Sequence, residues 1–436
     1  MAILTRQYLF RRRNRLRILQ SSFVAILRPF QYLNKMGDPQ RVFKYALAYI
    51  LIFFTLAWPV AAQETRTEII AQMQTVKAKN LHPYVPTKAE RIFLSVKKVL
   101  IDEPSGLYPL FGSVYGGGGF AVGGGYRQYY GDSTYWDAKG LWSIRNYKLA
   151  EISTNSLGHA QDRIDLHADF GWRDATQVAY YGLGMATSAE DRANFRFKKT
   201  YGGASLKARP IRWVKFGGAI SYEDYNLNKG LGARPSIEQL YTAQTAPALG
   251  TSPAYIHSMG SAGFDWRPAA GYARRGGMYE IRYHNFNDRK DTNSFDRLDA
   301  EVVQHVPILR ENWVISLRGL ASTTLDGSNT VPFFLLPSLG SSDTLRGYSA
   351  WRFRDRHSVL LQGEFRWIPN RMGLDMAMFF DAGKVTPSRS TLNLKRLKKD
   401  TGIEVRFHGP AATPLRLGVG HGTEGWHLVF GGSAAF

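Results

Sequence analysis

The sequence contains no cysteine. This absence excludes a disulfide scaffold, a cysteine-ligated zinc or iron–sulfur site, a thiol nucleophile and a bacterial lipoprotein anchor. Common enzyme motifs are missing as well: there is no G-x-S-x-G nucleophile elbow, no His-x-x-x-His pair and no Ser/His/acid set that can be placed. We therefore expect no catalytic residue, no metal and no cofactor, and a function that is not enzymatic.

Long apolar runs are scarce. The run at 45–58 follows Lys44 and precedes small residues that end at Ala62. This pattern is typical of a secretory signal peptide over residues 1–62 with cleavage after Ala62; an uncleaved anchor helix is the alternative. Residues 1–35 include a basic run at 11–17, which has three interpretations: part of a long leader, a nucleic-acid-binding arm, or sequence upstream of a true start at Met36. We favour the start at Met36 and expect no nucleic-acid partner.

Acidic residues are fewer than basic ones. The chain has 56 Lys and Arg against 35 Asp and Glu, and residues 1–62 hold only one acid, Asp38. The exported part remains basic, which suits the anionic headgroups of outer-membrane lipid and the phosphates of lipopolysaccharide. Solvated loops without a specific partner explain the same charge equally well.

The exported part is rich in strand-forming patterns. After Ala62 no second apolar run approaches 18 residues, so any membrane crossing would use strands. Residues 63–108 are interpreted as a short periplasmic segment, with a helix from Thr87 to Leu100. From Gly118 onward apolar and charged residues alternate, as in 163–173 and 359–367.

Such alternation fits either a soluble sheet or a transmembrane barrel with a wet lumen. The signal peptide and the lack of covering helices favour an all-β, antiparallel transmembrane barrel over residues 109–436. We expect 14–16 strands, with 16 preferred, extra strands within 145–156 and a long extracellular loop at 228–253.

Aromatic residues gather at the ends of the predicted strands, as in interfacial girdles; Tyr126, Tyr130 and Trp367 are examples. The last strand is predicted to reach the terminal residue, with Phe430 and Phe436 on one face. A terminal aromatic on an alternating strand resembles the signal by which outer-membrane barrels are recognised for insertion.

Three motifs near the C-terminus carry the most specific information. They are a loop motif with Arg346, Gly347 and Tyr348, followed by Arg352, Arg354 and Asp355; a strand with Glu364 and Arg366; and a strand with Phe379, Asp381 and Gly383. The R-G-Y loop and the F-x-D-x-G strand resemble hallmarks of the BamA/TamA family of outer-membrane proteins, also called bacterial surface antigens. The match is strongest over 336–436.

The resemblance implies a barrel in the bacterial outer membrane with an infolded loop. By strand parity Glu364 and Asp381 face the lumen, and the resemblance implies that Arg346 bridges them. The alternative is that these charges merely solvate the lumen.

The implied function is insertion or translocation of proteins or lipids, with unfolded outer-membrane or secreted proteins as partners. A passive porin-like barrel that keeps the fold is the alternative function. Residues 63–108 are too few for a POTRA domain and a linker, which puts POTRA-based client recruitment in doubt.

Glycine runs at 116–119 and 123–125 suggest a glycine-rich first strand. Paired with a last strand that holds Gly431 and Gly432, it would form a weak seam able to open toward lipid, because glycine packs poorly. The alternative is a glycine-lined wall packed closely against the infolded loop or the terminal helix.

Overall fold

The computed structural model describes residues 71, 73–75, 105–131, 133–290, 292–308, 311–325, 331–369, 373–409, 412–433 and 435–436. The chain divides into two units, Met1–Val85 and Pro86–Phe436, and almost all described residues belong to the second. The predicted signal peptide and the predicted helix at 87–100 lie outside the described residues. Among the residues that are described, no helix is both long and apolar enough to cross a membrane.

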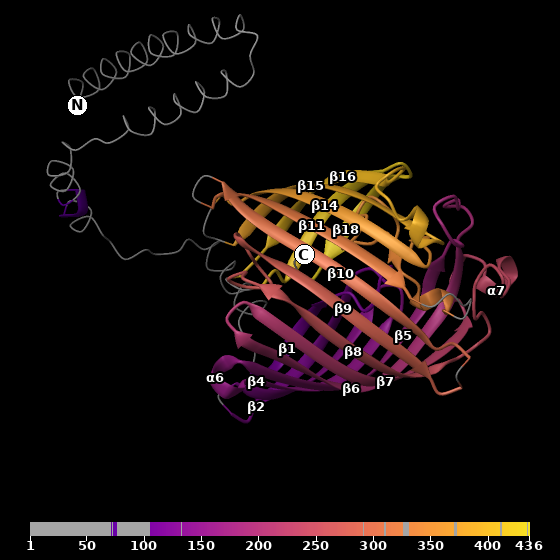
Figure 1. The fold of residues 1–436 in the computed structure, drawn as a ribbon, viewed down its shortest axis with the longest axis horizontal. Coiled ribbons are helices and arrows are strands. Elements are labelled where there is room, and N and C mark those ends of the chain that lie inside the picture. Colours follow the sequence, from indigo (N-terminus) through magenta and orange to yellow (C-terminus); the bar gives the residue numbers. More distant parts are fainter. Residues whose placement is uncertain are drawn as a thin grey trace, which may run out of the picture. The chain divides into compact units, whose positions relative to one another are not determined.

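The second unit is a nearly closed β-barrel built from a 16-stranded antiparallel sheet (Figure 1). Neighbouring strands in the chain pair in sequence order, except that the loop after β11 carries a small separate pair, β12 and β13. The barrel strands are β1 Gly106–Gly112, β2 Ala121–Tyr129, β3 Thr134–Ser143, β4 Lys148–Gly158, β5 Ile164–Tyr180, β6 Ala193–Ile211, β7 Val214–Lys229, β8 Ala254–Asp265, β9 Gly276–Asp288, β10 Phe295–Ile308, β11 Trp313–Thr324, β14 His357–Trp367, β15 Leu374–Thr386, β16 Lys398–Phe407, β17 Leu415–Gly422 and β18 Gly425–Gly431.

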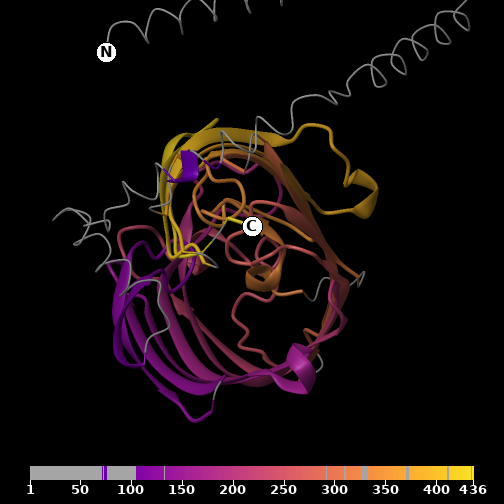
Figure 2. The same ribbon diagram turned by 90° about the vertical axis from the view of Figure 1, so that its left-hand side faces the viewer.

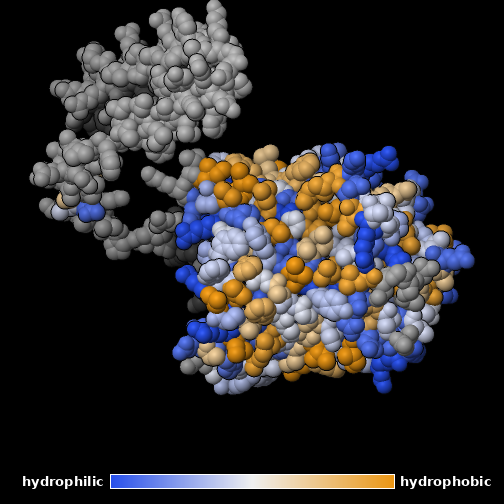
Figure 3. All heavy atoms as spheres, viewed as in Figure 1, coloured by the Kyte–Doolittle hydropathy of each residue, from blue (hydrophilic) through white to orange (hydrophobic). Residues whose placement is uncertain are grey.

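Burial along the strands is inverted relative to a soluble protein. On β14, Phe365 is 41% exposed, whereas its neighbour Glu364 is only 4% exposed. On β15, Met378 faces outward and Asp381 is fully buried. Apolar residues gather on the outer wall between the strand ends, and hydrophilic residues lie at both the left-hand and the right-hand ends of the barrel in Figure 3. An apolar outer face around a charged interior is the pattern of a barrel surrounded by lipid.

The two ends of the barrel differ in the length of their connections. At one end, here called the short-turn end, most connections are brief, as at 212–213 and in the turn with α6 (His159–Asp162). At the other, the long-loop end, lie 230–253 with α7 (Ile237–Leu240), 325–356 and 387–397. In bacterial barrels short turns face the periplasm and long loops face outward.

The predicted strand count of 16 is confirmed, but the first strand was placed wrongly. β1 begins at Gly106, before the expected boundary at residue 109, and contains Pro109 with apolar side chains on both faces. The glycines at 116–119 form the β1–β2 loop, and those at 123–125 lie on β2 rather than on the first strand. The extra strand expected near 145–156 is β4.

The last strand is shorter than predicted. β18 ends at Gly431, and Phe436 stacks on His305 of β10 with ring centroids 6.3 Å apart. The C-terminus lies within the barrel outline when the molecule is viewed along its axis (Figure 2). Phe436 is therefore not part of the wall, because the chain turns inward after Gly431 and a lumenal aromatic contact replaces strand pairing.

Candidate functional site

The loop between β11 and β14 enters the barrel. It carries the 3-10 helix η1 (Phe333–Leu335) and the short pair β12 (Ser338–Leu339) and β13 (Phe353–Arg354), and η1 lies inside the barrel outline in Figure 2. Leu345 and Tyr348 of this loop pack with Leu360 of β14 and Val385 of β15 in one buried cluster. This apolar contact fixes the loop against the inner wall and places the next charged residue among the strand carboxylates.

Arg346 binds two strands from inside the barrel. Its Nε and Nη2 donate to the two carboxylate oxygens of Asp381 at 2.8 and 2.7 Å, and its backbone N–H donates to the same carboxylate at 3.1 Å. Its Nη1 donates to Glu364 Oε1 at 2.5 Å. The guanidinium carbon lies 3.8 Å from the ring centroid of Phe379. Arg346 thus contacts both side chains of the F-x-D motif and the glutamate of the preceding strand.

The carboxylates around Arg346 stabilise its positive charge. The side chain is 1% exposed, and burial by itself would lower the pKa of Arg346. The carboxylates of Glu364 and Asp381 outweigh burial and raise this pKa above its ordinary value. A planar, permanently charged fork between two carboxylates forms a rigid junction between the loop and the wall.

The ion-pair network continues onto β16 and β17. Arg406 donates to Glu364 at 2.9 Å and also contacts Glu404, and Arg416 donates to Glu404 at 3.1 Å. Arg416 returns to the loop through Asp343 at 2.6 Å. Strand parity marks Glu404 and Arg406 as lumenal, but no sequence motif singles out Glu404, Arg406 or Arg416.

The two residues after Arg346 also meet the wall. A Cβ atom on Gly347 would lie 2.5 Å from Asp400 Cβ and 2.8 Å from the backbone nitrogen of Gly422, so only glycine fits. The Tyr348 hydroxyl donates to the carbonyl of Lys399 at 3.1 Å. Gly383 of β15 also lets the loop lie close to the wall, since a Cβ atom there would lie 2.9 Å from Leu339 of the loop.

The remaining predicted loop residues lie apart from Arg346. Arg352 pairs with Glu424 at 2.8 Å. Arg354 donates to the carbonyl of Phe333 at 3.0 Å, and burial lowers its pKa. Burial raises the pKa of Asp355, whose carboxylate accepts from the backbone N–H of the next residue. These residues hold the loop together at the long-loop end of the barrel.

Arg366 was predicted to face the lumen beside Glu364. It is buried there, but its ion pair is with Asp375 at 3.0 Å, and it also donates to the carbonyl of Ala273 at 2.7 Å. The structure therefore separates Arg366 from the Arg346 contacts and places it in a second cluster.

A second feature of the barrel is the edge between β1 and β18, here called the seam. Among the described residues the sheet runs from β1 to β18 without a ladder between these two strands. Just after β18 the chain comes close to the end of β1, since a Cβ atom on Gly432 would lie 3.9 Å from the Cα of Gly112. Phe430 of β18 packs edge-on against Phe120 of the β1–β2 loop, with centroids 5.3 Å apart.

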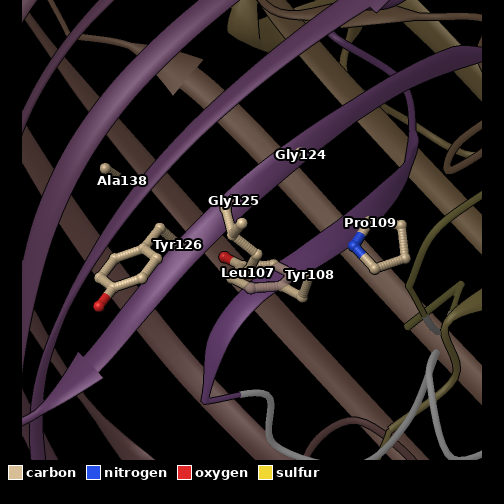
Figure 4. Close-up of a pocket in the computed structure, with 7 residues that line it drawn as sticks. All are labelled: Leu107, Tyr108, Pro109, Gly124, Gly125, Tyr126 and Ala138. Carbon is tan, nitrogen blue, oxygen red and sulfur yellow. The ribbon is translucent and has the colours of Figure 1, made fainter.

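The β1 side of the seam contains a hollow of about 420 Å³ over β1, β2 and β3. Figure 4 shows its lining residues: Leu107, Tyr108, Pro109, Gly124, Gly125, Tyr126 and Ala138. Tyr108 occupies the space that a side chain at Gly125 would need, since a Cβ there would lie 2.4 Å from the tyrosine ring. Its hydroxyl donates to Asp137 of β3 at 2.5 Å. The Tyr108 side chain thus links the edge strand β1 to β3, the second strand from the edge.

Comparison with known proteins finds a family match for the C-terminal part of the barrel. Residues 271–428 match the Omp85 superfamily domain, which includes the strands and loop around Arg346. No curated protein matches the sequence significantly.

Solved structures share the fold. A BamA from Haemophilus ducreyi that lacks POTRA domains 1–3 matches with a TM-score of 0.55 and 15% identity, over 76% of this chain and 70% of that one. CdiB from Escherichia coli matches with a TM-score of 0.51 and 10% identity, over 74% of this chain and 61% of that one. CdiB from Acinetobacter baumannii matches with a TM-score of 0.47 and 12% identity, over 75% and 56%.

Proposed function

Because residues 271–428 match the Omp85 superfamily domain, we propose that this chain resides in the bacterial outer membrane and inserts or translocates proteins there without catalysing a reaction. The observation that carries the proposal is the contrast within one sheet: fifteen neighbouring strand pairs form ladders, whereas β1 and β18 form none among the described residues. Unfolded outer-membrane or secreted proteins are the proposed clients, and lipids are a second class of cargo.

The proposed mechanism uses the seam as a lateral opening. A strand edge presents unpaired N–H and C=O groups, which are costly in lipid and therefore favour pairing with an arriving strand. A client strand that pairs with β1 or β18 would have its backbone groups satisfied before it enters the hydrocarbon region. The glycines near Gly112 and Gly432 leave little side-chain packing to break when the strands part.

The Arg346 contacts would serve this mechanism by keeping fixed the wall of β14–β17, which adjoins the β18 side of the seam. Arg346 links the loop to β14 and β15, and Arg416 links the loop to β17. With these strands held from inside, movement of the sheet would be confined to its free edges. The R-G-Y loop is thus proposed as an internal brace and not as a site of chemistry.

A reversible covalent lock tests the lateral opening. The chain has no cysteine of its own, and a Cβ atom added at Gly112 or at Gly432 would meet no atom closer than 3.7 Å. In a Gly112→Cys, Gly432→Cys variant, oxidation should abolish insertion of an unfolded eight-stranded barrel client into liposomes, and reduction should restore it. The readout is the fraction of client that becomes heat-resistant on a gel.

The matched control joins two strands that already pair. Gly140 of β3 and Ala150 of β4 are register partners, and Gly140 has room for a Cβ atom. The Gly140→Cys, Ala150→Cys variant should stay active when oxidised. Full activity of the oxidised seam variant would refute lateral opening. A large, steady conductance in planar bilayers that Arg346→Ala leaves unchanged would instead favour the passive porin.

A further inference from the structure

The loop between β15 and β16 lies outside the barrel wall. It spans residues 387–397, is here called the overhang, and contains the 3-10 helix η2 (Arg389–Thr391). In the view along the barrel, the gold segment that carries η2 extends beyond the outline of the wall (Figure 2). The overhang belongs to the long-loop end, and it lies to the side of the wall near the ends of the strands.

Side-chain contacts hold the overhang against the outer face. Lys384 of β15 has the same parity as the outward residues Met376 and Met378, yet it is only 8% exposed. Its ammonium donates to Asn393 Oδ1 at 2.8 Å and to the carbonyl of Lys395 at 3.3 Å. Arg389 donates to the carbonyl of Thr324, at the end of β11, at 2.9 Å. The overhang therefore folds down over β15 and reaches across β14 to β11.

The exposed part of the overhang combines cations with an apolar residue. The overhang includes Arg389, Lys395 and Arg396 and contains no Asp or Glu. Within the described ranges, none of these three forms an ion pair. Leu394, next to Lys395, is 62% exposed. Cations beside an exposed leucine, at the level where the apolar wall ends, match a surface that faces both phosphate groups and acyl chains.

We propose that the overhang binds the phosphate groups of lipopolysaccharide in the outer leaflet. The inference rests on the proposed outer-membrane location and on the long-loop end facing outward. Lipopolysaccharide fits better than a soluble anion because the cations lie beside the lipid-facing wall and not over the lumen. Its lipid A carries phosphates directly above acyl chains, in the order that the exposed cations and Leu394 require.

Binding of lipid A to the folded protein in detergent tests the proposal. The Lys395→Gln, Arg396→Gln variant should bind bisphosphorylated lipid A roughly tenfold more weakly, because each cation near an anionic lipid strengthens binding severalfold. The matched control is Arg289→Gln, Lys290→Gln, which removes two exposed cations from another loop at the same end and should change affinity less than about twofold. Native mass spectrometry at two salt concentrations measures the bound fraction.

Two other ligands identify what is recognised. Dephosphorylated lipid A should bind both variants and the parent equally weakly, and phosphatidylglycerol should bind the parent more weakly than lipid A does. The proposal would be overturned if the overhang variant and the control variant lost equal affinity for lipid A, or if the parent bound lipid A equally well with and without its phosphates. Tighter binding of phosphatidylglycerol than of lipid A would overturn the assignment to lipopolysaccharide. The oxidised seam variant should bind lipid A like the parent, so failure here is separate from failure of client insertion.

Discussion

The wall formed by β14–β17 and the seam between β1 and β18 belong to one sheet, but they are held in different ways. In the wall, ladders between strands are reinforced from inside by Arg346, Arg406 and Arg416 and their carboxylates. At the seam, two glycines approach and two phenylalanine rings touch, with no ladder among the described residues.

The difference indicates where the barrel resists change. Buried arginine–carboxylate networks are costly to disrupt, because loss of one partner leaves a charge unpaired in a low-dielectric interior. Aromatic contacts at a lipid-facing edge are worth far less. A barrel built in this way can open at the seam without disturbing its braced wall. Substitutions in the two regions should therefore differ in size and in the property they change.

The largest effect is expected for Arg346→Ala. The substitution leaves Asp381 buried without its main partner and removes one of the two arginines that pair with Glu364, at an expected cost of about 3–5 kcal/mol. Urea unfolding in detergent, followed by heat-modifiable gel mobility, measures the loss. Arg346→Lys should recover only part of it, since an ammonium cannot span both carboxylates as the guanidinium does. Unchanged unfolding in Arg346→Ala would contradict the role of the network as a brace.

A smaller loss is expected for Gly347→Ala. The added Cβ would meet Asp400 and the backbone of β17 at distances below 3 Å, so loop or strand must move, at about 1–3 kcal/mol. Gly218→Ala is the control, because a Cβ atom there meets nothing within 4 Å. The same unfolding assay applies, together with protease sensitivity of the loop. If both alanine variants unfold alike, close approach at Gly347 does not hold the loop.

On the seam side, Tyr108→Phe should cost about 1 kcal/mol. The change removes the hydrogen bond to Asp137 but keeps the ring beside Gly125, and Asp137 keeps its ion pair with Arg127 at 2.7 Å. Tyr126→Phe, which removes an exposed hydrogen bond to Gln128, should be nearly neutral. Hydrogen exchange of β1 compares the two variants. Equal exchange would show that Tyr108 does not tie β1 to the barrel.

Sequence patterns predicted the barrel and much of the wall, and their failures have local causes. Alternation identified the lumenal side of β14 and β15, because each strand has one lipid face and one wet face. It missed β1, where Pro109 and apolar residues on both faces hide the period. The inward turn after Gly431 depends on His305 from a distant strand, which no local pattern contains.

The candidate site shows the same limit. The contact of Arg346 with Glu364 and Asp381 followed from the family resemblance, and the geometry is present; its role in function stays a prediction. Arg416 could not be singled out, because its partner Asp343 lies in a loop whose path depends on tertiary packing.

An effect on stability no larger than that of Tyr108→Phe is expected for Phe430→Leu, and its main consequence should appear at the seam. The substitution removes the edge-on contact with Phe120, worth about 0.5–1.5 kcal/mol, while both strands keep their ladders to β2 and β17. Disulfide formation in the Gly112→Cys, Gly432→Cys background should become slower, because the two edges spend less time together. Phe365→Leu is the control: this ring stacks on Trp313 in the braced wall at 5.0 Å, and its loss should leave the crosslinking rate unchanged. If Phe365→Leu slows crosslinking as much as Phe430→Leu does, the seam is not mechanically separate from the wall, and the contrast between the two regions fails.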